Sequence, residues 1–418
     1  MTGSSVFPTP TPTAGTSYSS QPPVNASSVL LDGQLVNNST ITTTITGTGG
    51  ALYVYSNGAT TPTVTISGVA VTTITGQVIP TTVTYSGSQS ITVTTTYPPP
   101  STFNSSTMGS NSYYFTGVTY GVVSGTGYYV AVANGSYLGA YSTDGINWGN
   151  ASLGIAYGWN GVTYGVVSGT GYFVAVAGGS NNAAYCTDGI NFNPSTLPSS
   201  SYWYAVTYGN GYFVTVGSGT NSAYTTDAIN WNASTLPSIQ QWTNVTYGVI
   251  SGTGYFVAVA QTSVGGSTTA GAYSTNGTTW TASTMPSSRT WQGVAYGLAG
   301  PTPTYVAVAS GTTAGAYSTN GTSWTASTMP NTIQWWAVTY GLGYFVAVGY
   351  QTTVGAYSSN GSTWTALTMP IGLSWSGITY GNRKFVAVAY SNGGNGAYYT
   401  FPTFPVAFGI YDGPVGVH

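Results

Sequence analysis

Short runs of alternating polar and β-branched residues fill the first quarter of the chain. Residues 25–98 contain runs such as "STITTTITG", "TPTVTISG" and "QSITVTTTY", which Gly, Pro and Asn separate. Alternation with a period of two predicts strands that bury one face and expose the other. We therefore predict a small antiparallel β domain of the sandwich type over residues 25–98.

A longer repeat takes over after residue 101. Its marker is "VTYG" at Val118, Val162, Val206, Val245 and Val338, "VAYG" at Val294 and "ITYG" at Ile378. The copies are 39 to 49 residues apart. A period of about 40–50 residues in a strand-forming chain predicts one four-stranded blade per repeat. The fold class that we expect is all-β, with a seven-bladed β-propeller over residues 102–400.

Four strands can be assigned within each repeat. They are "W-x-x-V-T-Y-G", "Y-F-V-A-V-A", "G-A-Y-S-T" and, after a turn, "W-T-A-S-T-M-P". The turn contains Asn-Gly or Asp-Gly, which favour a type I′ hairpin with φ > 0 at both central residues. Ala228 stands where the other repeats have Gly, so we expect strain or another turn type there.

The seventh repeat lacks a fourth strand, and a candidate lies upstream of the first repeat. "TFNSSTMGS" at Thr102–Ser110 resembles "TWTASTMPS" at Thr279–Ser287. We predict that residues 102–109 complete the blade built from 373–400, because closing the ring this way removes an exposed sheet edge. The remaining segments are predicted to be an extended Pro/Ser/Thr-rich arm (1–24), a linker (99–101) and a C-terminal tail (401–418).

The charge content limits the chemistry that this chain can perform. It has 3 Lys+Arg, 5 Asp+Glu and one His, His418, among 418 residues. General acid–base catalysis and nucleic-acid binding both need clusters of such groups, so we expect neither an enzyme nor a nucleic-acid partner. The single Cys186 excludes a multi-cysteine metal site, and no apolar run approaches the ~18 residues of a membrane span. No metal, cofactor or membrane insertion is therefore expected.

The turns before the fourth strands carry a repeated pair of residues. The turn residues are Asp144, Asp188, Asp227, Asn276, Asn320 and Asn360, and the aromatic anchors after them are Trp148, Phe192, Trp231, Trp280, Trp324 and Trp364. A calcium site would need several oxygen ligands together, whereas each of these Asp residues stands alone in its turn. Asn and Asp both cap turns through a side-chain oxygen, which favours a structural role.

A second aromatic recurs three residues before each marker. The set is Phe115, Trp159, Trp203, Trp242, Trp291, Trp335 and Trp375. One interpretation is a ring at the mouth of the propeller that stacks on a ligand or a protein partner. The other is packing between blades, which is favoured because aromatic residues mostly lie in cores.

The turn motif resembles a known repeat. Ser142-Thr143-Asp144-Gly145, followed by Trp148, is similar to the Asp-box (BNR) repeat of sialidase-like propellers, with one residue fewer before the aromatic. The resemblance covers residues 102–400 and implies a structural turn between the third and fourth strands. Sialidases use an arginine triad and a Tyr nucleophile assisted by Glu. This chain has two Arg and no Glu, so sialidase activity is not expected.

These observations favour a non-enzymatic virion protein, such as a bacteriophage fibre, capsid decoration or tail-tip protein on the particle surface. The expected partners are other virion proteins, bound through the arm and the β domain, and host-surface glycans. So few charges predict an oligomer or a place in a large assembly. The alternatives are a lectin-like carbohydrate-binding propeller and a cell-surface layer or matrix protein.

Overall fold

The computed structural model describes residues 40–56, 63–66, 69–73, 79–94, 99–109, 114–391, 394–401 and 406–411. The chain divides into two units, Met1–Thr96 with Pro402–His418, and Tyr97–Phe401. The arm predicted over residues 1–24 lies outside the described residues.

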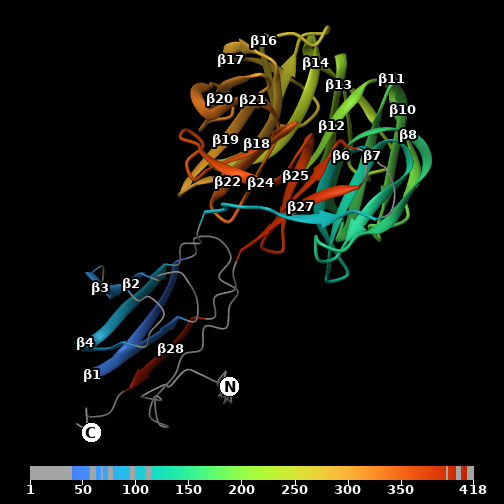
Figure 1. Cartoon of the computed structure of the whole chain (residues 1–418). Coiled ribbons are helices and arrows are strands. Elements are labelled where there is room, and N and C mark those ends of the chain that lie inside the picture. The colour runs from blue at the N-terminus through green and yellow to red at the C-terminus, as the bar shows by residue number, and fades with distance from the viewer. Residues whose placement is uncertain are drawn as a thin grey trace. The chain divides into compact units, whose positions relative to one another are not determined.

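The described part of the first unit is one antiparallel sheet in the order β28-β1-β4-β2-β3 (Figure 1). Its strands are β1 (Thr40–Ser56), β2 (Thr63–Ile66), β3 (Val69–Thr73), β4 (Ile79–Thr94) and β28 (Val406–Tyr411). The described residues show this single sheet and not the two sheets of the expected sandwich.

The C-terminal segment differs from the expected tail. Residues Val406–Tyr411 pair with Ala51–Ser56 of β1 as an antiparallel strand. The sequence "VAFGIY" has the apolar and aromatic content of a strand, and its pairing covers an edge of β1 that would otherwise be open. The first unit therefore combines segments from both ends of the chain.

The second unit is a propeller of seven four-stranded antiparallel blades, each with a first strand paired to a second. The first strands lie in β6 (Tyr114–Val123), β8 (Gly149–Val167), β12 (Trp203–Gly209), β14 (Asn232–Ile250), β18 (Trp291–Ala299), β21 (Thr325–Gly341) and β25 (Trp375–Gly381). The second strands lie in β7 (Thr126–Ser142), β9 (Thr170–Gly178), β13 (Tyr212–Thr225), β15 (Thr253–Gln261), β19 (Thr302–Ala309), β22 (Tyr344–Tyr350) and β26 (Lys384–Ala389). Strands β8, β14 and β21 also contain the fourth strand of the preceding blade, and β7 and β13 also contain the third strand of their own.

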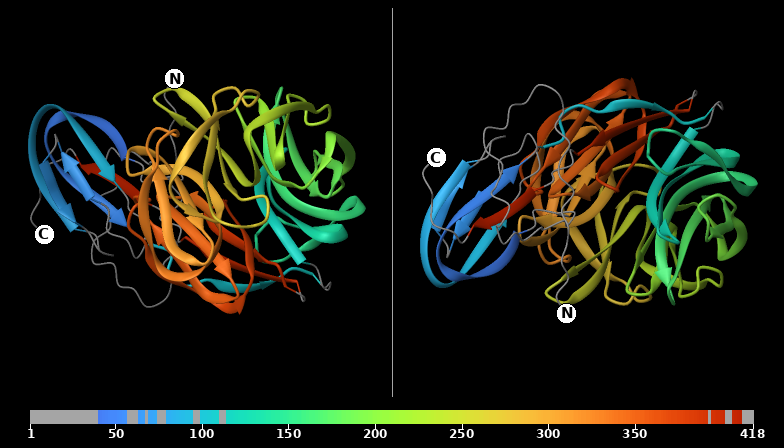
Figure 2. Two further views of the ribbon diagram at one scale, coloured as in Figure 1. Left: turned by 90° about the horizontal axis from the view of Figure 1, so that it is seen from above. Right: turned by 90° about the horizontal axis from the view of Figure 1, so that it is seen from below.

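The other third strands are β10 (Ser180–Cys186), β16 (Thr268–Ser274), β20 (Thr312–Ser318), β23 (Thr352–Ser358) and β27 (Asn395–Thr400). The other fourth strands are β11 (Asn193–Ser201), β17 (Thr281–Arg289), β24 (Thr365–Leu373) and β5 (Asn104–Thr107). Strand β5 pairs with β27, so an N-terminal strand completes the last blade. First strands of neighbouring blades contact each other around the ring, and β25 meets β6 to close it (Figure 2).

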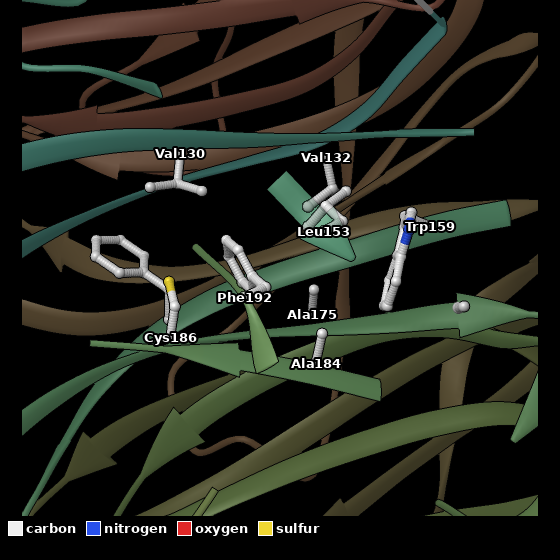
Figure 3. Packing of buried hydrophobic residues seen from close by; sticks show 10 residues of the cluster. Val130, Val132, Leu153, Trp159, Ala175, Ala184, Cys186 and Phe192 are labelled. Carbon is white, nitrogen blue, oxygen red and sulfur yellow. The ribbon is translucent and has the colours of Figure 1, made fainter. Parts of the chain in front are cut away.

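The hydrophobic core lies between successive blades. One cluster joins Val130 and Val132 of the first blade to Trp159 and Phe192 of the second, together with Cys186 (Figure 3). Burial raises the pKa of the Cys186 thiol to about 12. The thiol is therefore a small apolar core group and not a nucleophile at neutral pH.

The marker Tyr and Gly form a second set of contacts between blades. A Cβ atom added to Gly248 would lie 2.1 Å from the ring of Tyr296 in the next blade, so only glycine fits there. The same close approach recurs for Gly121–Tyr164, Gly165–Tyr208, Gly209–Tyr247, Gly297–Tyr340, Gly341–Tyr380 and Gly381–Tyr120. The last pair joins the final blade to the first. This contact is the physical reason that Tyr-Gly is repeated in every blade.

The turns before the fourth strands differ from the type I′ geometry predicted for them. Gly145 has a φ of 72° and Ala228 one of 67°, but Asp144 and Asp227 are not among the residues with positive φ. Two consecutive positive φ values occur instead in the hairpins between first and second strands, as at Ser124 and Gly125. The reason is that the Asp or Asn side chain caps its own turn, so only the next residue must be left-handed.

Candidate functional site

The turn residues Asp144 and Asn276 make the same hydrogen bonds in their respective turns. One oxygen of Asp144 accepts hydrogen bonds from the backbone N–H groups of Ile146 and Asn147, both at 2.8 Å. The side-chain oxygen of Asn276 accepts from the backbone N–H groups of the equivalent residues, both at 2.9 Å. No group of three His, Cys, Asp or Glu side chains that could hold a metal ion occurs among the described residues. The geometry is that of a capped turn.

Hydrogen bonding sets the protonation of the turn carboxylates. Burial alone would raise the pKa of Asp144, but bonds from the Asn147 backbone and side chain, the Ile146 backbone and the Ser142 hydroxyl lower it to about 2. Burial opposes ionisation at Asp188 and Asp227 too, and bonds from their own turns again lower the pKa. All three groups are therefore ionised at neutral pH.

These lowered pKa values predict a loss of stability in acid. A carboxylate with a lowered folded-state pKa stabilises the fold above its unfolded-state pKa, and the stabilisation is lost as pH falls towards the folded-state value. We expect the free energy of unfolding from urea titrations to fall between about pH 5 and pH 2, by less than ~1 kcal/mol for each turn, because these solvent-accessible groups are screened. A variant with Asp144→Asn, Asp188→Asn and Asp227→Asn should match the wild type at pH 7 and lose less in acid. Equal acid sensitivity of the two proteins would contradict this role of the carboxylates.

The turn anchors lie where the turn meets the preceding blade. Phe192 is buried, whereas Trp148, Trp231, Trp280, Trp324 and Trp364 are half-buried. Parallel bridges join each turn to the fourth strand of the preceding blade, as between Thr284 and Ser323. The anchors therefore contribute to the joints between blades.

The aromatic residues before the markers lie in the core. Phe115, Trp159, Trp203, Trp242, Trp291, Trp335 and Trp375 are each at most 1% exposed. The indole N–H of Trp203 donates to the carbonyl of Ser199 at 3.2 Å, and that of Trp335 donates to the carbonyl of Asn331 at 3.1 Å. With their rings buried, these side chains present no surface on which a ligand could stack.

A β-bulge follows this buried aromatic in every blade. The strand register shifts directly after each one, as between Phe115 and Gly117 or between Trp335 and Ala337. The residues in the bulges are Thr116, Asn160, Tyr204, Thr243, Gln292, Trp336 and Ser376. A bulge releases one residue from the ladder and redirects its side chain, and bulges are common beside functional sites. We call these seven positions the bulge residues.

Four bulge residues hold neighbouring blades together. Each donates a side-chain hydrogen bond to the carbonyl of the buried aromatic in the next blade. The bonds run from Thr116 to Trp159 (2.6 Å), from Asn160 to Trp203 (2.9 Å), from Thr243 to Trp291 (2.7 Å) and from Ser376 to Phe115 (2.6 Å). The role of these four residues is therefore to join neighbouring blades of the propeller.

The other three bulge residues are larger, and two of them are aromatic. Tyr204 stacks with Tyr202 at a ring-centroid distance of 6.4 Å, and Trp336 stacks with Tyr350 at 5.4 Å. Tyr202 is 59% exposed, which is high for so large an aromatic side chain. Each pair offers an aromatic face beside a redirected strand position.

The third large bulge residue begins a chain of amide side chains. Gln292 donates to Gln261 at 3.0 Å, Gln261 donates to Gln241 at 2.6 Å, and Gln241 donates to the carbonyl of Ser263 at 2.9 Å. All three glutamines are half-buried. These three groups lie at or beside the bulge positions of the third to sixth blades, and we name them together the aromatic–amide site: Tyr202, Tyr204, Gln241, Gln261, Gln292, Trp336 and Tyr350.

The aromatic–amide site combines apolar faces with uncharged hydrogen-bonding groups. Its polar groups are the hydroxyls of tyrosine, the amides of glutamine and the indole N–H of tryptophan, which form hydrogen bonds without carrying a fixed charge, so the site is suited to binding. The residues of this site were not predicted from the sequence. The signal was available, because the position after the buried aromatic varies between repeats while its neighbours recur.

Solved structures show which folds this chain is similar to. A streptogramin B lyase is 13% identical, with 72% of this chain and 97% of that chain covered at a TM-score of 0.59. A catalytically inactive His-to-Ala variant of virginiamycin B lyase from Staphylococcus aureus, with quinupristin, is 15% identical, with 71% and 98% covered at 0.59. YCF48 bound to D1 peptide is 16% identical, with 72% and 96% covered at 0.54. A scan of protein-family models found no match, and neither did a search of curated proteins.

The comparisons support the β-propeller and overturn the functional expectation. The three structures described above are two lyases and YCF48, so the expectation of a virion structural protein is wrong, and its alternatives have no counterpart among these three structures. The error came from treating a scarcity of charge as a mark of one class of assembly, when a propeller of this fold serves other roles. Because the similar folds include an enzyme, the fold gives no ground for excluding enzymatic activity. No described helix is long and apolar enough to cross a membrane.

Proposed function

We propose that this protein is a binding protein that holds an uncharged polypeptide segment at the aromatic–amide site. The observation that carries the proposal is the break in the sevenfold pattern at the bulge residues. Four of them serve the joints between blades, whereas Tyr204, Gln292 and Trp336 are larger and join further aromatic or amide side chains.

The chemistry of the site supports a polypeptide ligand. Glutamine side chains carry the same donor and acceptor groups as a peptide bond, so they can bond to both the N–H and the C=O of an extended segment. The stacked aromatic pairs supply large contact faces with few rotamers to order. Since none of these side chains is charged, the site gains nothing from a charged ligand and would leave its charge without a partner.

The similar structures give more support to a binding role for this chain than to a catalytic role. One of them is described as YCF48 bound to D1 peptide, a propeller with a peptide ligand. The lyase described as catalytically inactive has an alanine in place of a histidine. The only histidine of this chain is His418, which lies outside the described residues. Glycan binding and oligomer formation stay predictions from the sequence.

Peptide binding tests this function directly. We would probe the full chain with an array of uncharged 12-residue peptides and titrate those that bind by fluorescence anisotropy. Trp336→Ala and Tyr204→Ala should each weaken binding by about tenfold or more, as for aromatic hot spots. Gln292→Met keeps the size of the side chain but removes its amide, so it should weaken binding while leaving the thermal midpoint unchanged.

Tyr137→Ala is the matched control, because Tyr137 is 57% exposed and does not belong to the site. It should bind peptides as the wild type does. Loss of binding in the control equal to that of Trp336→Ala would overturn the placement of the site. An array on which no uncharged peptide binds, or on which acidic and basic peptides bind equally well, would overturn the proposed ligand.

A further inference from the structure

One serine and one tryptophan meet at most joints between blades. Parallel bridges link the fourth strand of each blade to the turn of the next, for example Thr284 to Ser323. The residue before the bridge on the strand is Ser283, and the residue after it on the turn is Trp324. The seven parallel bridges bring the equivalent two positions together at all seven joints.

The joint between the second and third blades shows a complete hydrogen-bonded arrangement. The indole N–H of Trp231 donates to the hydroxyl of Ser195 at 3.1 Å. The hydroxyl of Ser195 donates in turn to the carbonyl of Ile229 at 2.8 Å. Both polar groups are thereby satisfied, although Ser195 is only 8% exposed.

Four further joints have the same two residue types with both polar atoms buried and without a hydrogen-bond partner. The pairs are Ser106 with Trp148, Ser234 with Trp280, Ser283 with Trp324 and Ser327 with Trp364. A buried polar group without a partner is costly, and native structures contain few of them. Here a donor without a partner lies at the same joint as an acceptor without one, so one hydrogen bond at each joint, like that between Trp231 and Ser195, would satisfy both.

The two remaining joints have neither the serine nor the tryptophan. Ala151 meets Phe192 at one joint, and Leu367 meets Phe103 at the other. Packing alone would allow serine beside phenylalanine or alanine beside tryptophan. Among the seven joints serine occurs only with tryptophan, which is the pattern that a hydrogen bond between the two side chains requires.

We propose that an indole–serine hydrogen bond latches five of the seven joints, and that the ring opens first at the two joints without it. Two backbone hydrogen bonds cross each of those joints. They run from Phe192 N–H to Ser152 (2.8 Å) and from Ser152 N–H to Ile190 (2.7 Å), and from Phe103 N–H to Thr368 (2.9 Å) and from Thr368 N–H to Ser101 (2.9 Å). The Phe103 joint is also where β5 closes the propeller. The two joints without the serine–tryptophan pair therefore lie at the closing blade and between the first two blades.

A double-mutant cycle on Trp324 and Ser283 tests the latch. Trp324→Phe and Ser283→Ala should each change the unfolding equilibrium constant by about five- to tenfold, the net worth of a buried hydrogen bond. The double variant should be no less stable than Trp324→Phe alone, because the second change removes an acceptor that has already lost its donor. Strictly additive effects would overturn the latch.

The reverse experiment uses the joint of Ala151 and Phe192. Installing the pair with Ala151→Ser and Phe192→Trp together should stabilise the fold beyond the sum of the two single changes. No coupling between these two changes, in variants that fold, would count against the proposal.

Hydrogen exchange tests where the ring opens and needs no variant. The backbone N–H groups of Phe103 and Phe192 should exchange faster than those of Trp231 and Trp324. The indole N–H of Trp324 should be protected in the wild type and should exchange faster in Ser283→Ala. Equal protection of all joints would overturn the placement of the opening.

Discussion

Replacing Trp242 with alanine is expected to destabilise the propeller by about 3–5 kcal/mol, the usual cost of removing a large buried aromatic side chain. Trp242 is 0% exposed and packs with Val216, Val245 and Ala260. Its indole N–H also donates to the carbonyls of Gly219 and Ser238, both at 3.2 Å. Urea denaturation followed by circular dichroism would measure the loss.

The first blade provides the control for this prediction. Phe115 occupies the equivalent position there and is 0% exposed. Trp242→Phe should therefore cost less than Trp242→Ala, since it keeps the aromatic ring and leaves a smaller cavity. If Trp242→Ala had the same urea midpoint as the wild type, a core role would be contradicted. The seven buried aromatic residues would then again be candidate ligand-binding residues.

Replacing Gly248 with alanine is expected to cost about 3 kcal/mol, at the upper end of overpacking in a well-packed core. The new Cβ would lie 2.1 Å from the ring of Tyr296, which is closer than side-chain carbons approach in folded proteins. The ring cannot simply swing away, because the Tyr296 hydroxyl donates to the carbonyl of Val249. Thermal unfolding of the purified variant measures the effect.

Gly372→Ala is the matched control for Gly248→Ala. Its added Cβ would have the Thr353 side chain at 3.7 Å as its nearest neighbour, an ordinary van der Waals distance. We expect its free energy of unfolding to stay within about 0.5 kcal/mol of the wild-type value. If both variants lost the same stability, the cause would be the backbone preference of glycine and not the contact with Tyr296.

The repeats carried most of the information about the fold. The spacing of the seven markers predicted the number of blades, because each repeat is one unit of four strands whose partners lie nearby in sequence. The likeness of Thr102–Ser110 to a fourth strand pointed to the pairing of β5 with β27 in the same way. Strand β28 was not predicted, because its partner β1 lies more than 300 residues away in the chain and no repeat signals such a pairing.

The residues of the candidate site could be identified only from the tertiary structure. The sequence singled out the most regular residues, namely the turn residues and the buried aromatics. The structure assigns these to turns, joints and core, as the hydrogen bonds of Asp144 and the burial of Trp335 show. The aromatic–amide site lies at positions where the residue differs between repeats. The repeat pattern therefore does not point to them.

The sequence by itself therefore determined the class of the fold, the number of blades and the scarcity of charged residues, because these follow from local alternation, spacing and composition. Only the tertiary structure decided which repeated residues are accessible. A bulge after each buried aromatic turns Tyr204, Gln292 and Trp336 out of the ladder, and the register that defines this bulge exists only once two strands have paired. The contacts between Tyr204 and Tyr202, between Gln292 and Gln261, and between Trp336 and Tyr350 follow from that pairing and from the ring that holds the blades together.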